Sequence, residues 1–290
     1  MRKNILLIFL LVFYADSLFA NNIVIDDMGR KVTVVKPFKN IISLYAAHTE
    51  NLINLGIDKK KIVTDISYHD DIEKFLMAEP DLVLIRPMID QGYKNLIRNI
   101  EKNGIVVLSF QPNTIAEMYV YLENLGKLTG KLTASYEMIN KFKKEIVNLK
   151  VITNKIKNKK RVYFESIHSK MKTFSPDSMA IFALETAGGI NIASDAVSAR
   201  GTNIAEYGKE RILSHSDKID VYIAQVGTMN RSDIAIIKNE AGFKAIKAIR
   251  NNEIYLIDET IVSRPTLNLI EGINKISKIL YPDIYGIKKL

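Results

Sequence analysis

The 290-residue sequence contains no cysteine and no tryptophan. The absence of cysteine excludes disulfide bonds, zinc sites with thiolate ligands and thiol nucleophiles. It also excludes the cysteine to which a lipid anchor is attached, so we expect an exported form to be free rather than lipid-anchored. The absence of tryptophan leaves tyrosine emission and calorimetry as the practical readouts of a binding titration.

Motifs of the common enzyme classes are missing as well. The sequence has no Gly-x-Ser-x-Gly elbow, and Gly188-Gly189 and Gly201 fit neither nucleotide-binding fingerprint. The four histidines are far apart and form no His-x-x-x-His pair, so no metal-binding motif is present. We therefore expect no catalytic residues, no bound metal and no cofactor, with an enzyme whose site is assembled from distant residues as the alternative.

The hydrophobic run at the N-terminus is too short to span a bilayer. It extends from Ile5 to Phe13, follows the basic pair Arg2-Lys3 and precedes small residues that end at Ala20. This order is typical of a secretory signal peptide over residues 1–20, with a buried N-terminal helix as the alternative. No later stretch reaches transmembrane length, so we expect a soluble mature chain. A free exported protein needs an outer membrane to retain it, which favours the periplasm.

Positive charge dominates the sequence, with 41 lysines and arginines against 32 acidic residues and a net charge of +9. A basic exported protein is suited to an anionic ligand. Nucleic acid is the usual alternative partner, but the lysines are spread along the chain and the dense run 155–161 is typical of a solvated helix end. Because no nucleic-acid-binding motif is present, we expect no such partner.

Short apolar strands alternate with helices in two parts of the chain. Strands are predicted at 40–44, 62–67, 82–85 and 105–110, and again at 162–165, 221–225 and 254–257. The pattern predicts an α/β fold of two Rossmann-like lobes with parallel sheets, joined by a single long helix, and a single large α/β enzyme is the alternative. The expected segments are a signal peptide (1–20), an N-terminal lobe (21–130), a connecting helix (131–158) and a C-terminal lobe (159–290).

Several short motifs follow one another in a fixed order along the chain. They include Asp26-Asp27-Met28-Gly29-Arg30, Glu79-Pro80-Asp81-Leu82, Leu125-Gly126-Lys127-Leu128-Thr129-Gly130, Ala187-Gly188-Gly189-Ile190-Asn191 and Arg264-Pro265. Together their order and spacing resemble the iron-siderophore and cobalamin class of periplasmic binding proteins, over essentially the whole mature chain. The resemblance implies a monomer that closes little on its ligand, catalyses nothing and delivers that ligand to an ABC permease driven by its ATPase.

The resemblance also implies that loops after the strands hold the ligand between the lobes. The predicted ligand-binding residues are Tyr45, His48, Arg86, His168, Arg200 and Arg264. Tyrosine and histidine can stack on or ligate a chelated metal, and arginine can pair with carboxylate or catecholate oxygens. A structural salt bridge is the alternative for Arg86 and Arg264. The implied ligand is a ferric siderophore or a similar metal chelate, with cobalamin and haem as alternatives. A bilobal metalloenzyme or chelatase, and a metal-sensing or structural protein, are the alternatives from other classes of function.

A further implied feature is a surface glutamate on each lobe that docks onto the permease. Glu73, which precedes Pro80, and Glu210, on the helix that leads to Asp220, match these positions. The alternative is an ordinary exposed glutamate on a helix. The segment from Ser67 to Glu73 is shorter than the loop that walls the ligand in many relatives, which implies a more open cleft.

Overall fold

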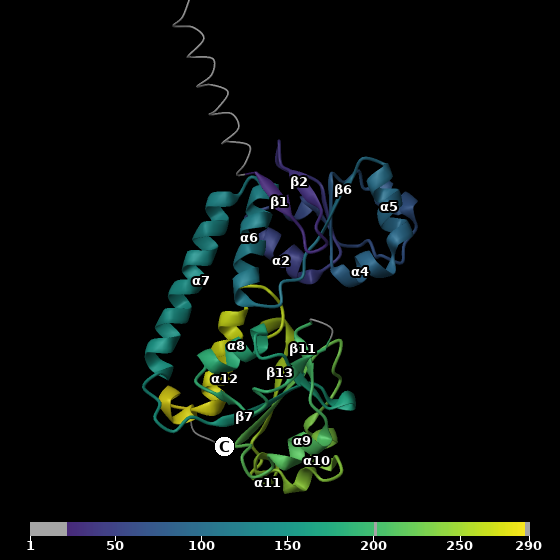
Figure 1. Ribbon diagram of the computed structural model, residues 1–290. Helices are drawn as coiled ribbons and strands as arrows, with labels where there is room; N and C mark the ends of the chain where they lie inside the picture. Colours follow the sequence, from purple (N-terminus) through teal and green to yellow (C-terminus); the bar gives the residue numbers. More distant parts are fainter. Residues whose placement is uncertain (1–21, 200–201, 288–290) are drawn as a thin grey trace, which may run out of the picture. The chain divides into compact units, whose positions relative to one another are not determined.

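The computed structural model describes residues 22–199 and 202–287, and they divide into two compact units (Figure 1). Unit 1 comprises residues 22–111 and 119–139, and unit 2 comprises residues 112–118 and 140–287. Helix α7 (Leu132–Thr153) continues from unit 1 into unit 2. The predicted signal peptide and the predicted ligand residue Arg200 lie outside the described residues.

Unit 1 is built on a four-stranded sheet in which all neighbouring strands are parallel, in the order β4-β3-β5-β6. Its strands are β3 (Ile41–Ser43), β4 (Ile62–Val63), β5 (Leu82–Ile85) and β6 (Val106–Ser109). All four residues of β5 are buried, as expected for an apolar strand that is covered on both faces. The parallel sheet predicted from the alternating pattern is therefore confirmed.

Helices cover both faces of this sheet. They are α2 (Ala46–Asn54), α3 (Ile72–Met77), α4 (Pro87–Gly92), α5 (Lys94–Lys102) and α6 (Ile115–Thr129). Successive side chains of a strand point to opposite faces, so Val83 and Ile85 pack with Phe75 of α3 and Ile97 of α5 in one core cluster. Helices α2 and α6 lie side by side and are joined by the hydrogen bond between His48 and Tyr121 (Figure 1).

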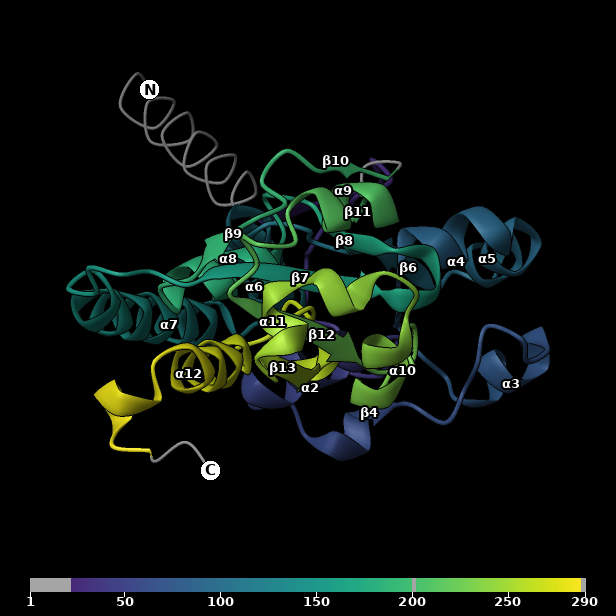
Figure 2. The ribbon, with the colours of Figure 1, turned by 90° about the horizontal axis from the view of Figure 1, so that it is seen from below.

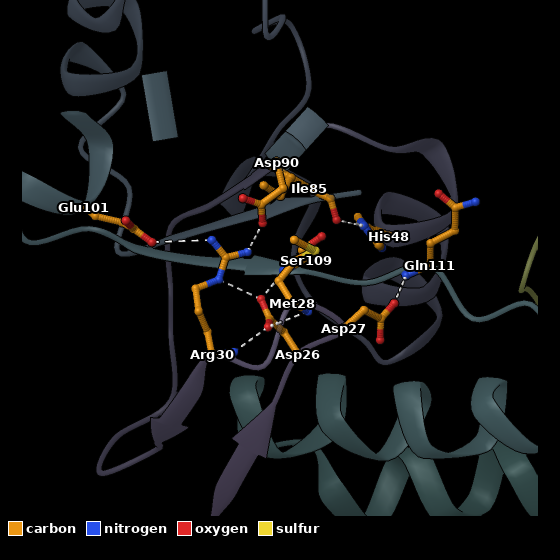
Figure 3. Close-up of polar contacts among 10 residues, drawn as sticks. All are labelled: Asp26, Asp27, Met28, Arg30, His48, Ile85, Asp90, Glu101, Ser109 and Gln111. Atoms are coloured by element: carbon orange, nitrogen blue, oxygen red, sulfur yellow. Dashed lines mark hydrogen bonds and ion pairs between the residues drawn. The ribbon is translucent and has the colours of Figure 1, made fainter. Parts of the chain in front are cut away.

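A short antiparallel hairpin of β1 (Ile23–Ile25) and β2 (Lys31–Thr33) is fixed to the end of β6. The buried carboxylate of Asp26 accepts hydrogen bonds from the backbone nitrogens of Met28 (3.0 Å), Arg30 (2.8 Å) and Ser109 (2.9 Å) and from Arg30 Nε (2.8 Å) (Figure 3). Gly29 has a φ of 84°, which the tight turn between the two strands requires. One carboxylate thus closes the turn and ties it to the sheet.

Unit 2 contains a mixed sheet in the order β10-β11-β8-β7-β12-β13, with β9 also paired to β7. Strands β7, β12 and β13 are parallel to one another, whereas β8, β11 and β10 add an antiparallel extension that the sequence pattern did not predict. The strands are β7 (Arg161–Ile167), β8 (Lys172–Phe174), β9 (Ile190–Asn191), β10 (Val197–Ser198), β11 (Ile204–Glu206), β12 (Val221–Val226) and β13 (Ile254–Asp258).

The unit 2 sheet lies between two groups of helices, α8 with α12 on one face and α9 to α11 on the other (Figures 1 and 2). The helices are α8 (Met179–Thr186), α9 (Lys209–Ser214), α10 (Ile234–Asn239), α11 (Lys247–Arg250) and α12 (Leu269–Leu280). Tyr163 and Tyr222 from the strands pack with Ile212 of α9 and Ile237 of α10. Within residues 22–199 and 202–287, no helix combines the length and the apolar composition that crossing a membrane requires.

Candidate functional site

In unit 1, an arginine and a tyrosine meet where two parallel strands end. Tyr45 precedes α2, shortly after β3, and Arg86 follows β5 directly. The guanidinium carbon of Arg86 lies 4.6 Å from the centroid of the Tyr45 ring, which is a cation–π arrangement. The nearest polar contact of the guanidinium is the sulfur of Met88 at 3.3 Å, and no carboxylate pairs with Arg86 in the part of the chain that the structure describes. The salt-bridge alternative for Arg86 therefore does not hold within these residues.

A hollow of about 560 Å³ lies beside Tyr45 at the carboxyl ends of β3 and β4. Tyr68 lines this hollow and packs with His69 and Tyr93, with ring centroids 4.4 Å and 4.9 Å away. The Tyr93 hydroxyl lies 3.1 Å from His69 Nδ1. The short segment after Ser67 thus places an aromatic cluster next to the hollow.

His48, predicted from the sequence as a ligand-binding residue, lies in the core of unit 1. Its side chain is completely buried, and Nε2 donates to the carbonyl of Ile85 at 3.0 Å (Figure 3). Nδ1 lies 2.7 Å from the hydroxyl of Tyr121. Burial lowers the pKa of His48 to about 4, so the ring is neutral near pH 7. His48 joins α2, β5 and α6 behind the candidate site. Leu52, one helical turn later, is also buried, and this spacing marks the same inward face.

The wild-type protein is expected to lose stability in acid, and exchanging His48 for glutamine is expected to remove most of that loss. The unfolded chain takes up a proton at its ordinary pKa of 6.5, but the folded chain does so only at about 4, so stability falls as the pH drops from 6.5 to about 4. The shift corresponds to roughly 3 kcal/mol of unfolding free energy. Urea unfolding at about pH 7 and about pH 4.5 measures the loss in both proteins. An equal loss in the wild type and in His48→Gln would contradict the neutral, buried imidazole.

In unit 2, the end of β7 holds a buried carboxylate with three partners. Glu165 is fully buried and accepts hydrogen bonds from His168 Nδ1 (2.8 Å), Asn230 Nδ2 (3.3 Å) and the hydroxyl of Tyr222. The hydrogen bond with Glu165 raises the pKa of His168, against the opposing effect of its burial. The site therefore favours an imidazolium at His168.

Asn230 fixes the loop that follows β12. Its Oδ1 accepts from the backbone nitrogen of His168 at 3.1 Å, and its Nδ2 also donates to the carbonyl of Gln225 at 2.8 Å. The Gln225 side chain accepts a hydrogen bond from Ser263, in the loop after β13. The loops after three parallel strands are thus tied together at one edge of the sheet. A hollow of about 340 Å³ at this edge is lined by His168, Ser169, Ile236 and residues 228–232.

Sequence reasoning found His168 but missed Glu165 and Asn230. A glutamate inside the apolar strand that begins at Val162 was the available signal, since a buried charge requires a partner. Arg264 is placed differently from Arg86, because its Nη2 lies 3.2 Å from Glu259 Oε1 in a partly buried ion pair. The structure thus favours the salt-bridge alternative for Arg264.

The two predicted docking glutamates occupy corresponding places in their units. Glu73 lies in the first turn of α3 and Glu210 in the first turn of α9, and both are exposed. Each helix leads to an aspartate that precedes a central strand and binds the start of the neighbouring one. Asp81 accepts from the backbone nitrogen of Asn40 (3.0 Å), and Asp220 accepts from that of Arg161 (2.9 Å).

Among the described residues, no group of three or more histidine, aspartate and glutamate side chains is arranged to hold a metal ion.

Comparisons with known proteins agree with this architecture. Residues 47–261 match the periplasmic binding protein family. The uncharacterized ABC transporter substrate-binding lipoprotein YvrC of Bacillus subtilis (strain 168) is 23% identical over 283 residues, which cover 91% of this chain and 87% of the relative. The crystal structure of a possible iron-binding (periplasmic solute-binding) protein from Staphylococcus epidermidis has a TM-score of 0.72 and 24% identity, covering 85% of this chain and 100% of that one.

A second solved structure carries the same fold with a different named ligand. The periplasmic vitamin B12 binding protein BtuF of Vibrio cholerae has a TM-score of 0.63 and 18% identity, and the match covers 85% of this chain and 98% of that one. At these identities the likeness shows a shared fold.

Proposed function

Because this chain belongs to the periplasmic binding protein family, we propose that it is the solute-binding component of an ABC importer and works in the periplasm. In this proposal the chain captures a ferric siderophore or a similar bulky, anionic metal chelate and delivers it to a permease. It performs no catalysis, since the importer's ATPase supplies the energy. The observation that carries the choice of ligand is Arg86, which is stacked on Tyr45 and lacks a carboxylate partner among the described residues.

The surroundings of Arg86 suit an anionic chelate with flat or aromatic parts. A guanidinium presents several donors in one plane and can bind a carboxylate or catecholate through two hydrogen bonds. Stacking on Tyr45 holds that plane before the ligand arrives, which lowers the entropy cost of binding. The hollow lined by Tyr45 and Tyr68 offers apolar and aromatic surface, and the net charge of +9 attracts an anion.

Truncating Arg86 to alanine is expected to weaken binding of a ferric siderophore by about tenfold to a hundredfold, which corresponds to charge-assisted hydrogen bonds of roughly 1.5–3 kcal/mol. Arg98→Ala is the matched control, because Arg98 is exposed on α5 and, among the described residues, forms hydrogen bonds only within its own helix. Arg264→Ala should weaken binding less than Arg86→Ala, since Glu259 already pairs with Arg264. Calorimetry measures all four dissociation constants.

The same titrations separate the ligand classes. Ferric siderophores, haem and cobalamin are each titrated against the wild type and Arg86→Ala. Tight cobalamin binding that does not depend on Arg86 would overturn the assignment to an anionic chelate and leave the transport role standing. Equal losses of affinity in Arg86→Ala and Arg98→Ala would show that Arg86 does not bind the ligand.

A further inference from the structure

The hollow at the end of β7 and β12 is lined by two residues whose buried polar atoms have no hydrogen-bond partner among the described residues. These atoms are His168 Nε2 and Ser232 Oγ. Buried polar atoms in folded proteins are ordinarily paired with protein, water or ligand. Arg231 lines the same hollow, is exposed, and forms no ion pair with any residue that the structure describes. The hollow is therefore lined by the His168 ring, which favours a positive charge, by the Arg231 guanidinium and by the Ser232 hydroxyl.

His168 is held so that its second nitrogen forms no hydrogen bond with the described residues. Nδ1 donates to Glu165, which fixes the ring and directs Nε2 away from that carboxylate. The backbone nitrogen of His168 is bound to Asn230, so the ring and the loop of residues 228–232 keep their relative places. The hydrogen bond with Glu165 raises the pKa of His168, which favours the ring that carries a proton on Nε2 as well.

Other charged groups face His168 from the neighbouring elements. Glu240, after α10, places Oε2 3.6 Å from His168 Nε2, which is beyond hydrogen-bond distance. Lys209 of α9 forms an ion pair with the other oxygen of Glu240 and offsets its charge. Tyr222 of β12 donates a hydrogen bond to Glu165, the carboxylate that binds His168 Nδ1. Glu240 is thus the one described acid that competes for Nε2.

We propose that His168, Arg231 and Ser232 form a subsite in unit 2 that binds a carboxylate group. A carboxylate accepts hydrogen bonds on both oxygens, so it can satisfy the imidazolium, the guanidinium and the hydroxyl together. The subsite rests on the proposed function, because it names the chemistry of the ligand that this edge of unit 2 receives: a chelate with free or metal-bound carboxylates. Glu165 and Asn230 act as positioning residues.

Citrate is the probe that tests this subsite in the full-length protein, with binding followed by calorimetry and by the imidazole NMR signal of His168. Arg231→Gln is expected to weaken citrate binding about tenfold and Ser232→Ala about threefold, while Arg98→Gln leaves it unchanged. A wild type whose His168 signal does not respond to citrate overturns the subsite. Equal losses in Arg231→Gln and Arg98→Gln overturn it as well, since they indicate attraction by net charge alone.

Glu240→Gln is expected to change the affinity for citrate in the direction opposite to Arg231→Gln and Ser232→Ala. Removing this competing carboxylate is expected to strengthen citrate binding several-fold, because His168 Nε2 and Lys209 are then both open to the anion. Weaker binding in Glu240→Gln contradicts the proposal. The two proposals fail separately: Arg86→Ala reports on the chelate site of unit 1, whereas Arg231→Gln and Glu240→Gln report on the carboxylate subsite of unit 2.

Discussion

Replacing Glu73 and Glu210 together by arginine is expected to abolish uptake of the ligand and to leave its dissociation constant nearly unchanged. Each glutamate is exposed in the first turn of a helix, one in each unit, and both helices lead to an aspartate that anchors a central strand. Two negative charges at corresponding places suit basic pockets on a permease, and reversing them replaces attraction by repulsion. Uptake is measured in cells that lack the wild-type chain, and affinity is measured by calorimetry.

The control for this experiment carries the same change of charge at other helices. Glu137 on α7 and Glu271 on α12 are exposed glutamates, so Glu137→Arg with Glu271→Arg alters the net charge by the same amount. We expect this control to transport normally. Normal uptake by the Glu73 and Glu210 double variant would refute the docking role. Equal loss in both double variants would show that net charge, and not these two positions, governs uptake.

Truncating Asp26 to alanine is expected to destabilise the protein by about 3 kcal/mol. The buried carboxylate accepts three backbone hydrogen bonds and one from Arg30, and its removal leaves the backbone donors of the hairpin turn and of Ser109 without this acceptor (Figure 3). Arg30 also pairs with Asp90 and Glu101, so the loss spreads to α4 and α5. Urea unfolding followed by tyrosine emission measures the effect.

The matched control for this prediction is Asp58→Ala. Asp58 also accepts a backbone hydrogen bond, from Lys60 at 3.0 Å, but does so at an exposed helix start. We expect a cost of about 1 kcal/mol or less there. If Asp26→Ala unfolded at the same urea concentration as Asp58→Ala, the hairpin clamp would not contribute to stability.

Local sequence pattern was sufficient for the central strands, and the helix predicted at 131–158 is present as α7, which ends at Thr153. The apolar runs at β5 and β12 are buried on both faces. Such runs can be recognised in the sequence without knowing which strands lie beside them. Gly242, with a φ of 88°, separates α10 from α11. Helix α2 begins at Ala46, because the extended backbone ends at Tyr45.

The pairing of strands that are distant in the sequence could not be predicted from local pattern. The strand predicted at 62–67 ends at Val63, where exposed residues leave the sheet. Strands β8, β10 and β11 have two or three residues each and form through antiparallel pairing with one another and with β7. Their short patterns carry no periodicity of their own.

The candidate site shows the same division between local and distant information. Arg86 and His168 were found because polar residues directly after parallel strands gather at one sheet edge. The partners that decide what each side chain can do come from far along the chain. The hydroxyl of Tyr121, 73 residues away, binds the buried ring of His48. The side chain of Asn230, 65 residues from Glu165, donates to the carboxylate that holds His168.

Native mass spectrometry of the protein recovered from the periplasm of iron-limited cells tests whether the chain captures a metal chelate. We expect one metal chelate bound to each chain of the wild type and a reduced bound fraction for Arg86→Ala, with the Arg98→Ala control resembling the wild type. The contradicting result is a chain recovered without a small molecule that also binds neither ferric siderophore nor haem nor cobalamin when these are added.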